Sequence, residues 1–524
     1  MLRDYDIPSQ ATNTAYLQYN NWNDFGYQTL FNLTVFDENG TRFDIGNIKL
    51  GFVGQDDETT VVEHISEEFE NLSDDFFSLG QDADFYQNMV EDLSEEMVTN
   101  LLTTLGDVVH DDSRLECAKN EPVFNISLLR TVNHISISEQ FKRILGKEAL
   151  LTDYHFFYKK EPNEVYSGIE VEFKVKPNSK PSSNIHILIG RNGVGKTTLL
   201  NNMVDALLPE RGEEEETGRF TKERTSGFIG RVGFNNYFAG VVSVSFSAFD
   251  PFIPPDDQSD NSVGMRYYYV GLKKRIVQQT QQQDKIAWGL KDKNDLCNDF
   301  TSSLEVCFAL GSKRERWVKA IKKLESDANF AAMDLCQLVG IYLENERDSF
   351  DKATKSLFSR MSSGHAIVLL TITKLVETVE EKTLLLLDEP ESHLHPPLLS
   401  AFTRALSDLL VNRNAVAIIA THSPVVLQEV PKSCVSILRR TGLVTKVDRP
   451  ENETFAENVG VLTREIFGLE VSKSGFHNLL EASVEEGRSY EDIMAEYENQ
   501  LGFEGKIILR SMIVTRDSQV EATR

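Results

Sequence analysis

Residues 185–198 read IHILIGRNGVGKTT, an apolar run followed by a glycine-rich turn. Within this stretch, Gly190, Gly195, Lys196 and Thr197 fill the spacing G-x-x-x-x-G-K-S/T. The N–H groups of such a turn can cradle phosphates, the lysine adds a positive charge, and the threonine hydroxyl can ligate Mg²⁺. The stretch therefore predicts a buried strand, a phosphate-binding loop and a helix. The residues expected to bind ATP are Gly190, Arg191, Asn192, Gly193, Val194, Gly195, Lys196, Thr197 and Thr198.

A second apolar run ends in two carboxylates, in the sequence TLLLLDEPESHLHP at residues 383–396. Asp388 would lie at the carboxyl end of a buried strand, where it can hold Mg²⁺ together with Thr197. Glu389 would face the terminal phosphate and is the candidate that polarises the attacking water. Two solvated carboxylates at a strand end are the alternative, which the phosphate-binding loop upstream makes less favourable.

Two further motifs complete the expected site. AVAIIATHSP, at residues 415–424, places His422 after another buried strand, where an imidazole can bind the γ-phosphate and act in hydrolysis. Ser362, Ser363 and Gly364 open an apolar helix, and a helix N-terminus attracts anions. One nucleotide does not need two such devices, so we expect this helix to cap the nucleotide of a second chain. Simple helix capping by serine is the alternative.

In their order along the chain, the four motifs resemble those of the ABC ATPase superfamily. GRNGVGKTT is similar to its Walker A motif, LLLLDE to Walker B, MSSGH to the signature motif and THS to the switch histidine. DEPESHLHP resembles the RecF, SMC and OLD-like branch, with His395 where transporters carry the D-loop aspartate. His365 stands in the glutamine position of the signature, and VVSVSFSAFDP contains no Q-loop glutamine. The resemblance implies an α/β, ABC/SMC-like head that binds Mg²⁺ and ATP as a homodimer or higher homo-oligomer.

A closer resemblance covers most of the chain. FDIGNIKLGFVGQ, FFSLGQDADFY, VVSVSFSAFDPF and LTREIFGLEVSKSGF are similar to the PtuA ATPases of Septu-type and retron-associated anti-phage modules. The resemblance implies an HNH nuclease partner (PtuB-like), and a reverse transcriptase with its nucleic acid in a retron setting. The sequence shows neither an HNH motif nor the DxD pair of a TOPRIM domain, so we expect no nuclease activity in this chain. A RecF/SMC-like repair or recombination ATPase that acts directly on DNA is the alternative.

Charge is distributed unevenly along the chain. Its 54 basic and 81 acidic residues give a net charge of −27, which disfavours a surface covered by nucleic acid. Residues 273–323 are the exception, with twelve basic residues against six acidic ones. This segment is either a nucleic-acid surface that includes Lys313, Arg314 and Arg316, or a solvated helix face. Residues 50–113 contain no Lys or Arg, which indicates an acidic insertion, either solvated or able to dock a basic partner.

The periodicity of apolar residues divides the chain into six segments. Apolar positions at helical spacing, including Phe76, Phe77 and Leu79, predict helices in the second segment. We expect no membrane span, because the apolar runs are far shorter than the roughly 20 residues required, and five scattered cysteines favour the cytoplasm. The expected segments are 1–55 (antiparallel part of the ATPase head), 56–150 (acidic helical insertion), 151–260 (head with Walker A), 261–358 (helical, leading to the signature), 359–475 (head with signature, Walker B and switch histidine) and 476–524 (helical tail).

Overall fold

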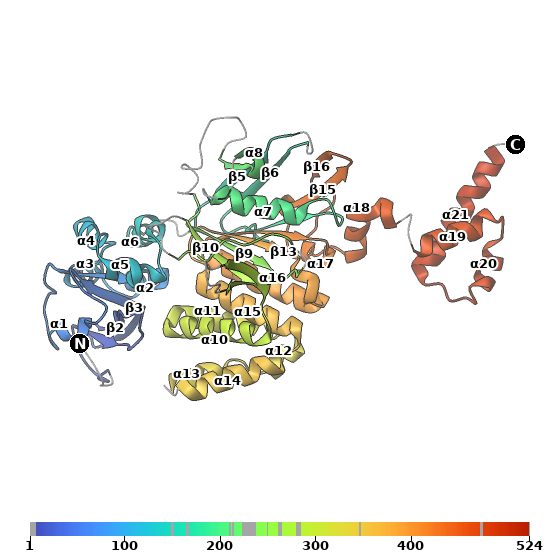
Figure 1. The fold of residues 1–524 in the computed structure, drawn as a ribbon. Coiled ribbons are helices and arrows are strands. Elements are labelled where there is room, and N and C mark those ends of the chain that lie inside the picture. The colour runs from blue at the N-terminus through green and yellow to red at the C-terminus, as the bar shows by residue number, and fades with distance from the viewer. Residues whose placement is uncertain are drawn as a thin grey trace.

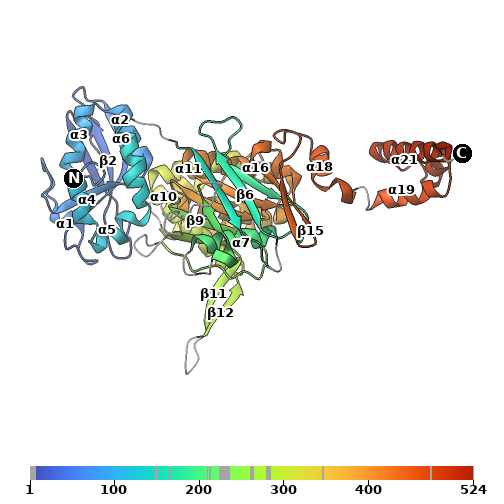
Figure 2. The ribbon, with the colours of Figure 1, turned by 90° about the horizontal axis from the view of Figure 1, so that it is seen from above.

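The computed structural model describes residues 7–147, 151–163, 167–208, 211, 214–222, 237–248, 250–259, 265–278, 285–344, 347–471 and 475–522. Figures 1 and 2 show three parts along the chain: an N-terminal α/β unit, a central head and a small C-terminal helical unit. Among the described residues, no helix is both long enough and apolar enough to cross a bilayer.

A seven-stranded sheet forms the centre of the head, in the order β10-β9-β13-β14-β7-β15-β16. Every neighbouring pair is parallel except β15–β16. The inner strands are continuous apolar runs because helices or strands cover both faces. The α/β prediction is therefore confirmed. The strands are β7 Ile185–Ile189, β9 Gly240–Ser245, β10 Arg266–Gly271, β13 Thr383–Asp388, β14 Val416–Thr421, β15 Val435–Thr441 and β16 Val444–Asp448.

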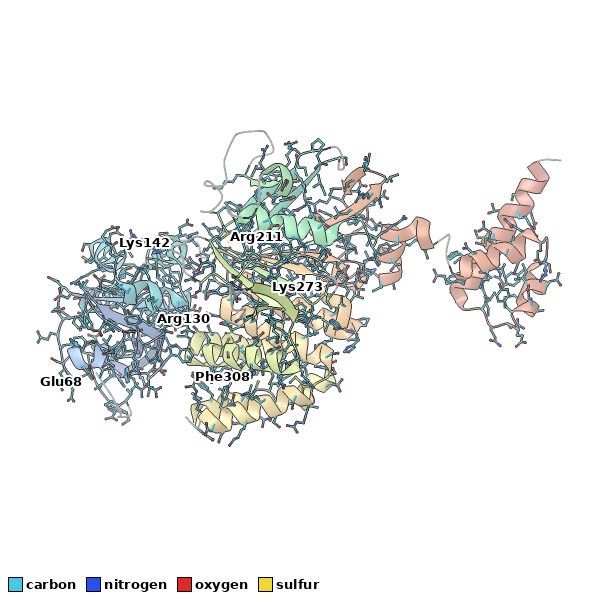
Figure 3. The ribbon with its side chains drawn as sticks, in the orientation of Figure 1. Glu68, Arg130, Lys142, Arg211, Lys273 and Phe308 are labelled. Carbon is cyan, nitrogen blue, oxygen red and sulfur yellow. The ribbon has the colours of Figure 1, made fainter. Side chains whose placement is uncertain are left out.

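Different layers cover the two faces of this sheet (Figure 1). One face packs against α7 (Lys196–Leu207) and a three-stranded sheet of β6 (Ile169–Val175), β5 (Tyr154–Lys160) and β8 (Arg219–Thr221). The other face packs against a helical layer that shares one core with the sheet, in which Phe308 (labelled in Figure 3) contacts Trp317. These helices are α10 Lys293–Ala309, α11 Gly311–Leu324, α12 Ala328–Ala332, α13 Gln337–Leu343, α14 Arg347–Arg360, α15 Ser363–Thr378, α16 Pro396–Asn412 and α17 Pro424–Leu427.

The N-terminal unit has a core of its own. An antiparallel sheet, in the order β1-β2-β3-β4, packs with the helices of residues 61–145 into one apolar cluster. Residues on both sides of position 55 belong to this unit, and its sheet is separate from the head sheet. The elements are β1 Thr14–Tyr19, β2 Leu30–Phe36, β3 Arg42–Phe52, α1 Val61–His64, β4 Phe76–Gly80, α2 Ala83–Asp92, α3 Glu95–Thr104, α4 Asp112–Ala118, α5 Pro122–Ile126 and α6 Lys142–Leu145.

Two segments expected to be helical contain strands. Phe76, Phe77 and Leu79 lie in β4, which is buried along its whole length, so period-two alternation is absent and the helical prediction was wrong. Residues 266–278 and 285–290 form β10 and the antiparallel hairpin strands β11 (Lys273–Gln278) and β12 (Lys285–Leu290), although we expected the segment 261–358 to be helical. The aromatic run in β10 favours a strand, which pairs with β9 at the sheet edge. The hairpin projects from the head in Figure 2.

Buried charges join the N-terminal unit to the head. The Arg413 guanidinium, 1% exposed, binds Asp82 of the N-terminal unit at 2.9 Å and Glu380 of the head at 2.7 Å. Asp82 also binds Arg316 at 2.6 Å, and Glu380 binds Lys313 at 2.9 Å. Every side chain in this network is less than 10% exposed, so the two units meet through desolvated ion pairs rather than through a solvated surface.

The C-terminal unit is a small helical cluster that stands apart from the head in Figures 1 and 2. It follows α18 (Val459–Val471) of the head and consists of α19 (Phe476–Glu485), α20 (Tyr490–Glu496) and α21 (Phe503–Ala522). The three helices pack around Leu480, Ile493 and Leu509, in the segment for which we expected a helical tail.

Candidate nucleotide site

The candidate site lies at the carboxyl edge of the head sheet. In the register of the strands, Asp388 pairs with Ser245 and with Ala420, and Thr421 pairs with Ile189. The segments that leave β7, β13 and β14 therefore begin side by side. They carry the glycine-rich loop, the Asp388–Glu389 pair and His422, so the sheet brings together three motifs that lie far apart in the sequence.

The glycine-rich loop has the backbone that a phosphate cradle requires. Gly193 and Gly195 have φ angles of +80° and +95°, a region that favours glycine. At Gly190 the requirement is spatial, since a Cβ there would overlap the carbonyl oxygen of Leu438 on β15. Lys196 is almost fully buried, and its Nζ donates to the carbonyl oxygens of Gly190 and Arg191 at 3.1 and 3.2 Å. These contacts hold the ammonium group against the loop.

Thr197 and Asp388 lie together as a pair of hard oxygen ligands. The Thr197 hydroxyl donates to Asp388 Oδ2 at 2.9 Å and lies 3.1 Å from Oδ1. Burial, with the nearby charge of Glu389, raises the pKa of Asp388 to about 7. A carboxylate that is costly to ionise without a positive partner beside it suits a divalent cation. The two side chains thus fit Mg²⁺, which Thr197 and Asp388 would hold.

Glu389 is placed by an unusual backbone conformation. It is a non-glycine residue with φ of +44°, and its N–H donates to Ala420 O at 2.8 Å. Such conformations carry strain that the surrounding structure must support, and they gather at functional sites. Its Oε1 lies 3.8 Å from Lys196 Nζ and 3.5 Å from His422 Nδ1. With 31% of its side chain exposed, Glu389 can meet water and the loop lysine at once.

Glu391, to which we assigned no role from the sequence, organises the neighbouring strand end. Its Oε1 accepts hydrogen bonds from Thr421 Oγ1 at 2.6 Å and from His422 N at 2.7 Å, and it lies 3.1 Å from His422 Nδ1. Glu391 therefore orients the imidazole of His422. Its position two residues after Glu389 in the DEPE motif was the available signal. Asp250, in the segment after β9, is also close enough to raise the pKa of Asp388.

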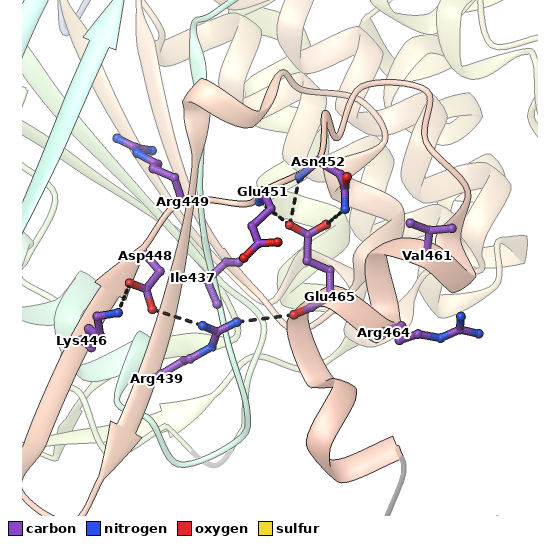
Figure 4. A pocket seen from close by; sticks show the side chains of 10 residues that line it. All are labelled: Ile437, Arg439, Lys446, Asp448, Arg449, Glu451, Asn452, Val461, Arg464 and Glu465. Atoms are coloured by element: carbon purple, nitrogen blue, oxygen red, sulfur yellow. Dashed lines mark hydrogen bonds and ion pairs between the residues drawn. The ribbon is translucent and has the colours of Figure 1, made fainter. Parts of the chain in front are cut away.

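A cavity of about 710 Å³ opens beside the loop. Its lining residues come from the loop, the β14 end, the β15–β16 hairpin and α18, and they are Arg191, Asn192, Gly193, Val194, His422, Arg440, Gly442 and Phe467. This volume suits a nucleotide. A second cavity, of about 520 Å³, lies between β15, β16 and α18 (Figure 4). Its central charges already bind each other, as in Lys446–Asp448 and Arg439–Asp448, so it is the weaker candidate.

Ser362, Ser363 and Gly364 lie at the N-terminus of α15, as expected, but their contacts differ from those of the loop. The Ser362 side chain caps the helix by accepting from His365 N. A Cβ at Gly364 would overlap the carbonyl oxygen of His393, so this glycine allows close packing against the segment after Glu389. The serine cap that we considered as the alternative is thus present, and it leaves Ser363 exposed.

Comparison with known proteins shows the family of the chain. Protein ea59 of Escherichia phage lambda is 47% identical over 527 residues, which cover 98% of this chain and 97% of ea59. The chain belongs to the ea59 family. The family model described as "AAA domain, putative AbiEii toxin, Type IV TA system" matches residues 341–428 of the present chain. These residues include Ser362–Gly364, Asp388, Glu389 and His422.

Solved structures similar to this ea59-family chain include ATPase heads. An ATP-binding cassette of an ABC transporter in its ADP conformation covers 61% of the chain and 99% of its own length, with 14% identity and a TM-score of 0.31. The SMC head domain from Thermotoga maritima covers 57% and 98%, with 12% identity and a TM-score of 0.27. Scores this low add nothing to the argument. The strand order, the glycine-rich loop between β7 and α7 and the AAA family model indicate a P-loop ATPase-type domain in this chain.

The basic segment 273–323 of this ea59-family chain is mostly engaged within the protein. Lys313 and Arg316, for which a nucleic-acid surface and a solvated helix face were the two alternatives, are buried in the ion pairs that join the two units, and Trp317 is fully buried. On the hairpin, Lys274 pairs with Asp295 and Arg275 with Asp256. The exposed lysines of α11 line a cavity of about 1030 Å³ whose other lining residues include Asp44, Asp82, Asp84 and Asp408. Acidic residues therefore line the same cavity as these lysines.

Proposed function

We propose that this chain hydrolyses ATP at a site shared between two copies of itself, and that it thereby controls a partner enzyme. The observation that carries the proposal is the convergence of Lys196, Thr197, Asp388, Glu389 and His422 at one edge of the sheet. ATP and Mg²⁺ are the cofactors of such a site. When bound, they supply the phosphoryl group and the charge neutralisation that hydrolysis requires.

Each residue has a part that follows from its position. The glycine-rich loop and Lys196 would bind the β- and γ-phosphates, and Thr197 and Asp388 would hold Mg²⁺. Glu389 orients and deprotonates the attacking water, because its carboxylate is exposed beside Lys196 and is held by a strained backbone. His422, oriented by Glu391, donates a hydrogen bond to the γ-phosphate. The cavity between the loop and Phe467 would hold the base and ribose.

The second chain enters through Ser362, Ser363 and Gly364. These residues form a helix N-terminus with an exposed Ser363, packed against residues after Glu389 rather than built into the loop. A helix N-terminus of a partner chain would add N–H and hydroxyl donors to the open side of the γ-phosphate. ATP binding would then close two chains on each other, and hydrolysis would release them.

Two variants test this proposal. Lys196→Ala removes the charge that binds the phosphates and should abolish binding of a fluorescent ATP analogue. Glu389→Gln should lower kcat by at least about a hundredfold and leave an ATP-bound dimer, seen by analytical ultracentrifugation. Glu429→Gln, whose carboxylate pairs with Arg404 away from the site, is the control and should turn over like the wild type. Wild-type turnover in Glu389→Gln would refute the assignment of the base.

The output of the chain belongs to another polypeptide in our proposal. The resemblance to PtuA ATPases supports a PtuB-like HNH nuclease as the partner, with a reverse transcriptase and its nucleic acid added in a retron setting. A relative encoded by phage lambda supports a role in competition among phages and their hosts. ATP-dependent dimerisation would set the geometry, and so the activity, of the nuclease.

Affinity purification from the native host, followed by mass spectrometry, tests the partner. A small HNH protein should co-purify with the wild type, and Glu389→Gln should change its cleavage of plasmid DNA and total RNA. DNA-stimulated ATP turnover by the chain alone, with no HNH protein retained, would favour the repair ATPase instead.

A further inference from the structure

One buried carboxylate joins the two histidines at which this chain departs from the ABC pattern. Asp327, 7% exposed, lies between α11 and α12. Its Oδ1 is 3.2 Å from His365 Nε2, and its Oδ2 is 3.2 Å from His395 Nε2. His365 follows Gly364 in the signature motif, and His395 follows the Walker B motif. Asp327 therefore holds one residue from each of the two elements that the proposed dimer brings to its interface.

The carboxylate is ionised, and it accepts hydrogen bonds from His365 and from the backbone of α12. Burial acts to raise the pKa of Asp327, but hydrogen bonds from Phe330 N, from His365 and from Asn329 N outweigh it and hold this pKa below its ordinary value. The backbone bonds, at 3.1 and 2.9 Å, also cap α12. Because an ionised carboxylate only accepts, the His365 imidazole must donate from Nε2.

This assignment fixes the direction of the hydrogen bond between His365 and Ser362. Their Nδ1 and Oγ atoms lie 2.6 Å apart. In a neutral imidazole that donates from Nε2, Nδ1 is an acceptor, so Ser362 must donate its single hydroxyl hydrogen to His365. In a charged imidazole, Nδ1 becomes a donor to Ser362 Oγ. The hydroxyl hydrogen of Ser362 is then free to point away from its own chain.

The signature and the segment after Glu389 are also joined through the backbone. The absent Cβ of Gly364 allows the His393 carbonyl to approach it closely, two residues before His395. Residues 362–365 and 393–395 thus form one packed unit with Asp327 at its centre. A change in the charge of His365 would therefore act on the donors of the signature without displacing the loop that holds the nucleotide.

We propose that Asp327 and His365 are positioning residues of the shared ATP site, which set whether Ser362 donates its hydrogen to His365 or to the nucleotide of the partner chain. This role rests on the proposed function, because it needs a second chain on the signature. Asp327 stabilises the charged imidazole, and the charged imidazole directs Ser362 toward the phosphate. The titratable groups that face His365 are Asp327 of the α11–α12 connection and His395 of the segment after Glu389.

The pH dependence of dimerisation tests the proposal. Histidine changes its charge near neutral pH. In the Glu389→Gln background with saturating Mg²⁺ and ATP, the dimer should tighten by about tenfold between pH 8 and pH 6, as one charge-assisted donor is gained. His365→Gln, added to this background, restores the side chain of the ABC pattern, whose amide can donate to Ser362 at every pH. Its dimer affinity should change by less than about threefold over the same range.

Asp327→Asn separates positioning from helix capping. Asparagine caps a helix as well as aspartate does, but it cannot stabilise a charged His365. At pH 6 the dimer of Asp327→Asn should be about tenfold weaker, with unchanged binding of a fluorescent ATP analogue by the single chain. Asp292→Asn is the matched control, because Asp292 caps α10 through Asn294 N and Asp295 N. It should behave like the Glu389→Gln parent.

Each outcome decides one of the two proposals. If His365→Gln follows the pH curve of its parent, or if Asp327→Asn matches Asp292→Asn, the positioning role is overturned. If the parent binds ATP but forms no ATP-dependent dimer at any pH, the two-chain site is overturned, and the positioning role falls with it. A flat curve in His365→Gln beside a tightening curve in the parent would support both.

Discussion

Replacing Arg413 by methionine should loosen the joint between the N-terminal unit and the head. At an effective dielectric constant of about 20, each of its ion pairs, with Asp82 and with Glu380, contributes about 4 kcal/mol of attraction. Burying the guanidinium costs several kcal/mol, which the variant recovers. Asp82 keeps Arg316 and Glu380 keeps Lys313, so the loss lies at the low end for a broken buried pair. We expect the Arg413→Met variant to lose about 3 kcal/mol of its free energy of unfolding.

Arg404→Met is the matched control, on the helix α16 that Arg413 caps. The Arg404 guanidinium pairs with Glu429 at 2.6 Å, but its side chain is 34% exposed. The free energy of unfolding of Arg404→Met should therefore fall by less than about 1 kcal/mol. Urea unfolding gives the stabilities, and hydrogen–deuterium exchange of β3, α2 and α16 shows whether the joint opens first. Equal losses in the two variants, or unchanged exchange in α2 of Arg413→Met, would refute the reasoning.

Two further predictions concern the strand and loop that begin the nucleotide site. Burial, with the Arg449 charge, lowers the pKa of His186 to about 3, against about 6.5 in an unfolded chain. The unfolded state therefore binds more protons, and the free energy of unfolding should fall by about 2 kcal/mol from neutral pH to pH 5. Urea titrations of His186→Leu should lack this fall, while the exposed-site control His155→Gln should retain it. Gly190→Ala should weaken ATP binding at least about tenfold, because its methyl group meets the β15 backbone. The methyl group of Gly193→Ala meets no atom within 4 Å, so this variant should lose only about 1 kcal/mol of ATP-binding free energy. The reverse ranking in a fluorescent ATP titration would contradict this reading of the loop.

The parts of the site that the sequence could predict are contiguous in the chain. A strand, a glycine-rich turn and a helix form one local unit, so the loop could be placed without knowing any other element. Asp388 and His422 each follow an apolar run. Because the carboxyl ends of parallel strands meet at one edge, their proximity to the loop could be expected without the strand order.

The sequence did not reveal pairings between distant residues. A run such as SKRERWVKAIKK resembles a solvated basic face, because nothing nearby indicates that Asp82 and Glu380 neutralise Lys313 and Arg316. Likewise, Asp327 gives no signal of its contact with His365 and His395. β4 was mistaken for helix for a related reason: its burial comes from helices packed around it, which removes the alternation that marks a half-exposed strand.

The distant pairings converge on the short connection between α15 and β13. This connection joins the helix that begins with the signature to the strand that ends in Asp388. Within it, Glu380 binds Arg413, Glu381 binds Arg143 of the N-terminal unit at 2.6 Å, and Lys382 binds Glu139 of that unit. The expected signature segment and the carboxylates that we propose as catalytic therefore share one anchor, and that anchor is held by the N-terminal unit. A partner that shifts the N-terminal unit would act on both halves of the ATP site together, which is the arrangement that coupling an ATPase to a separate enzyme requires.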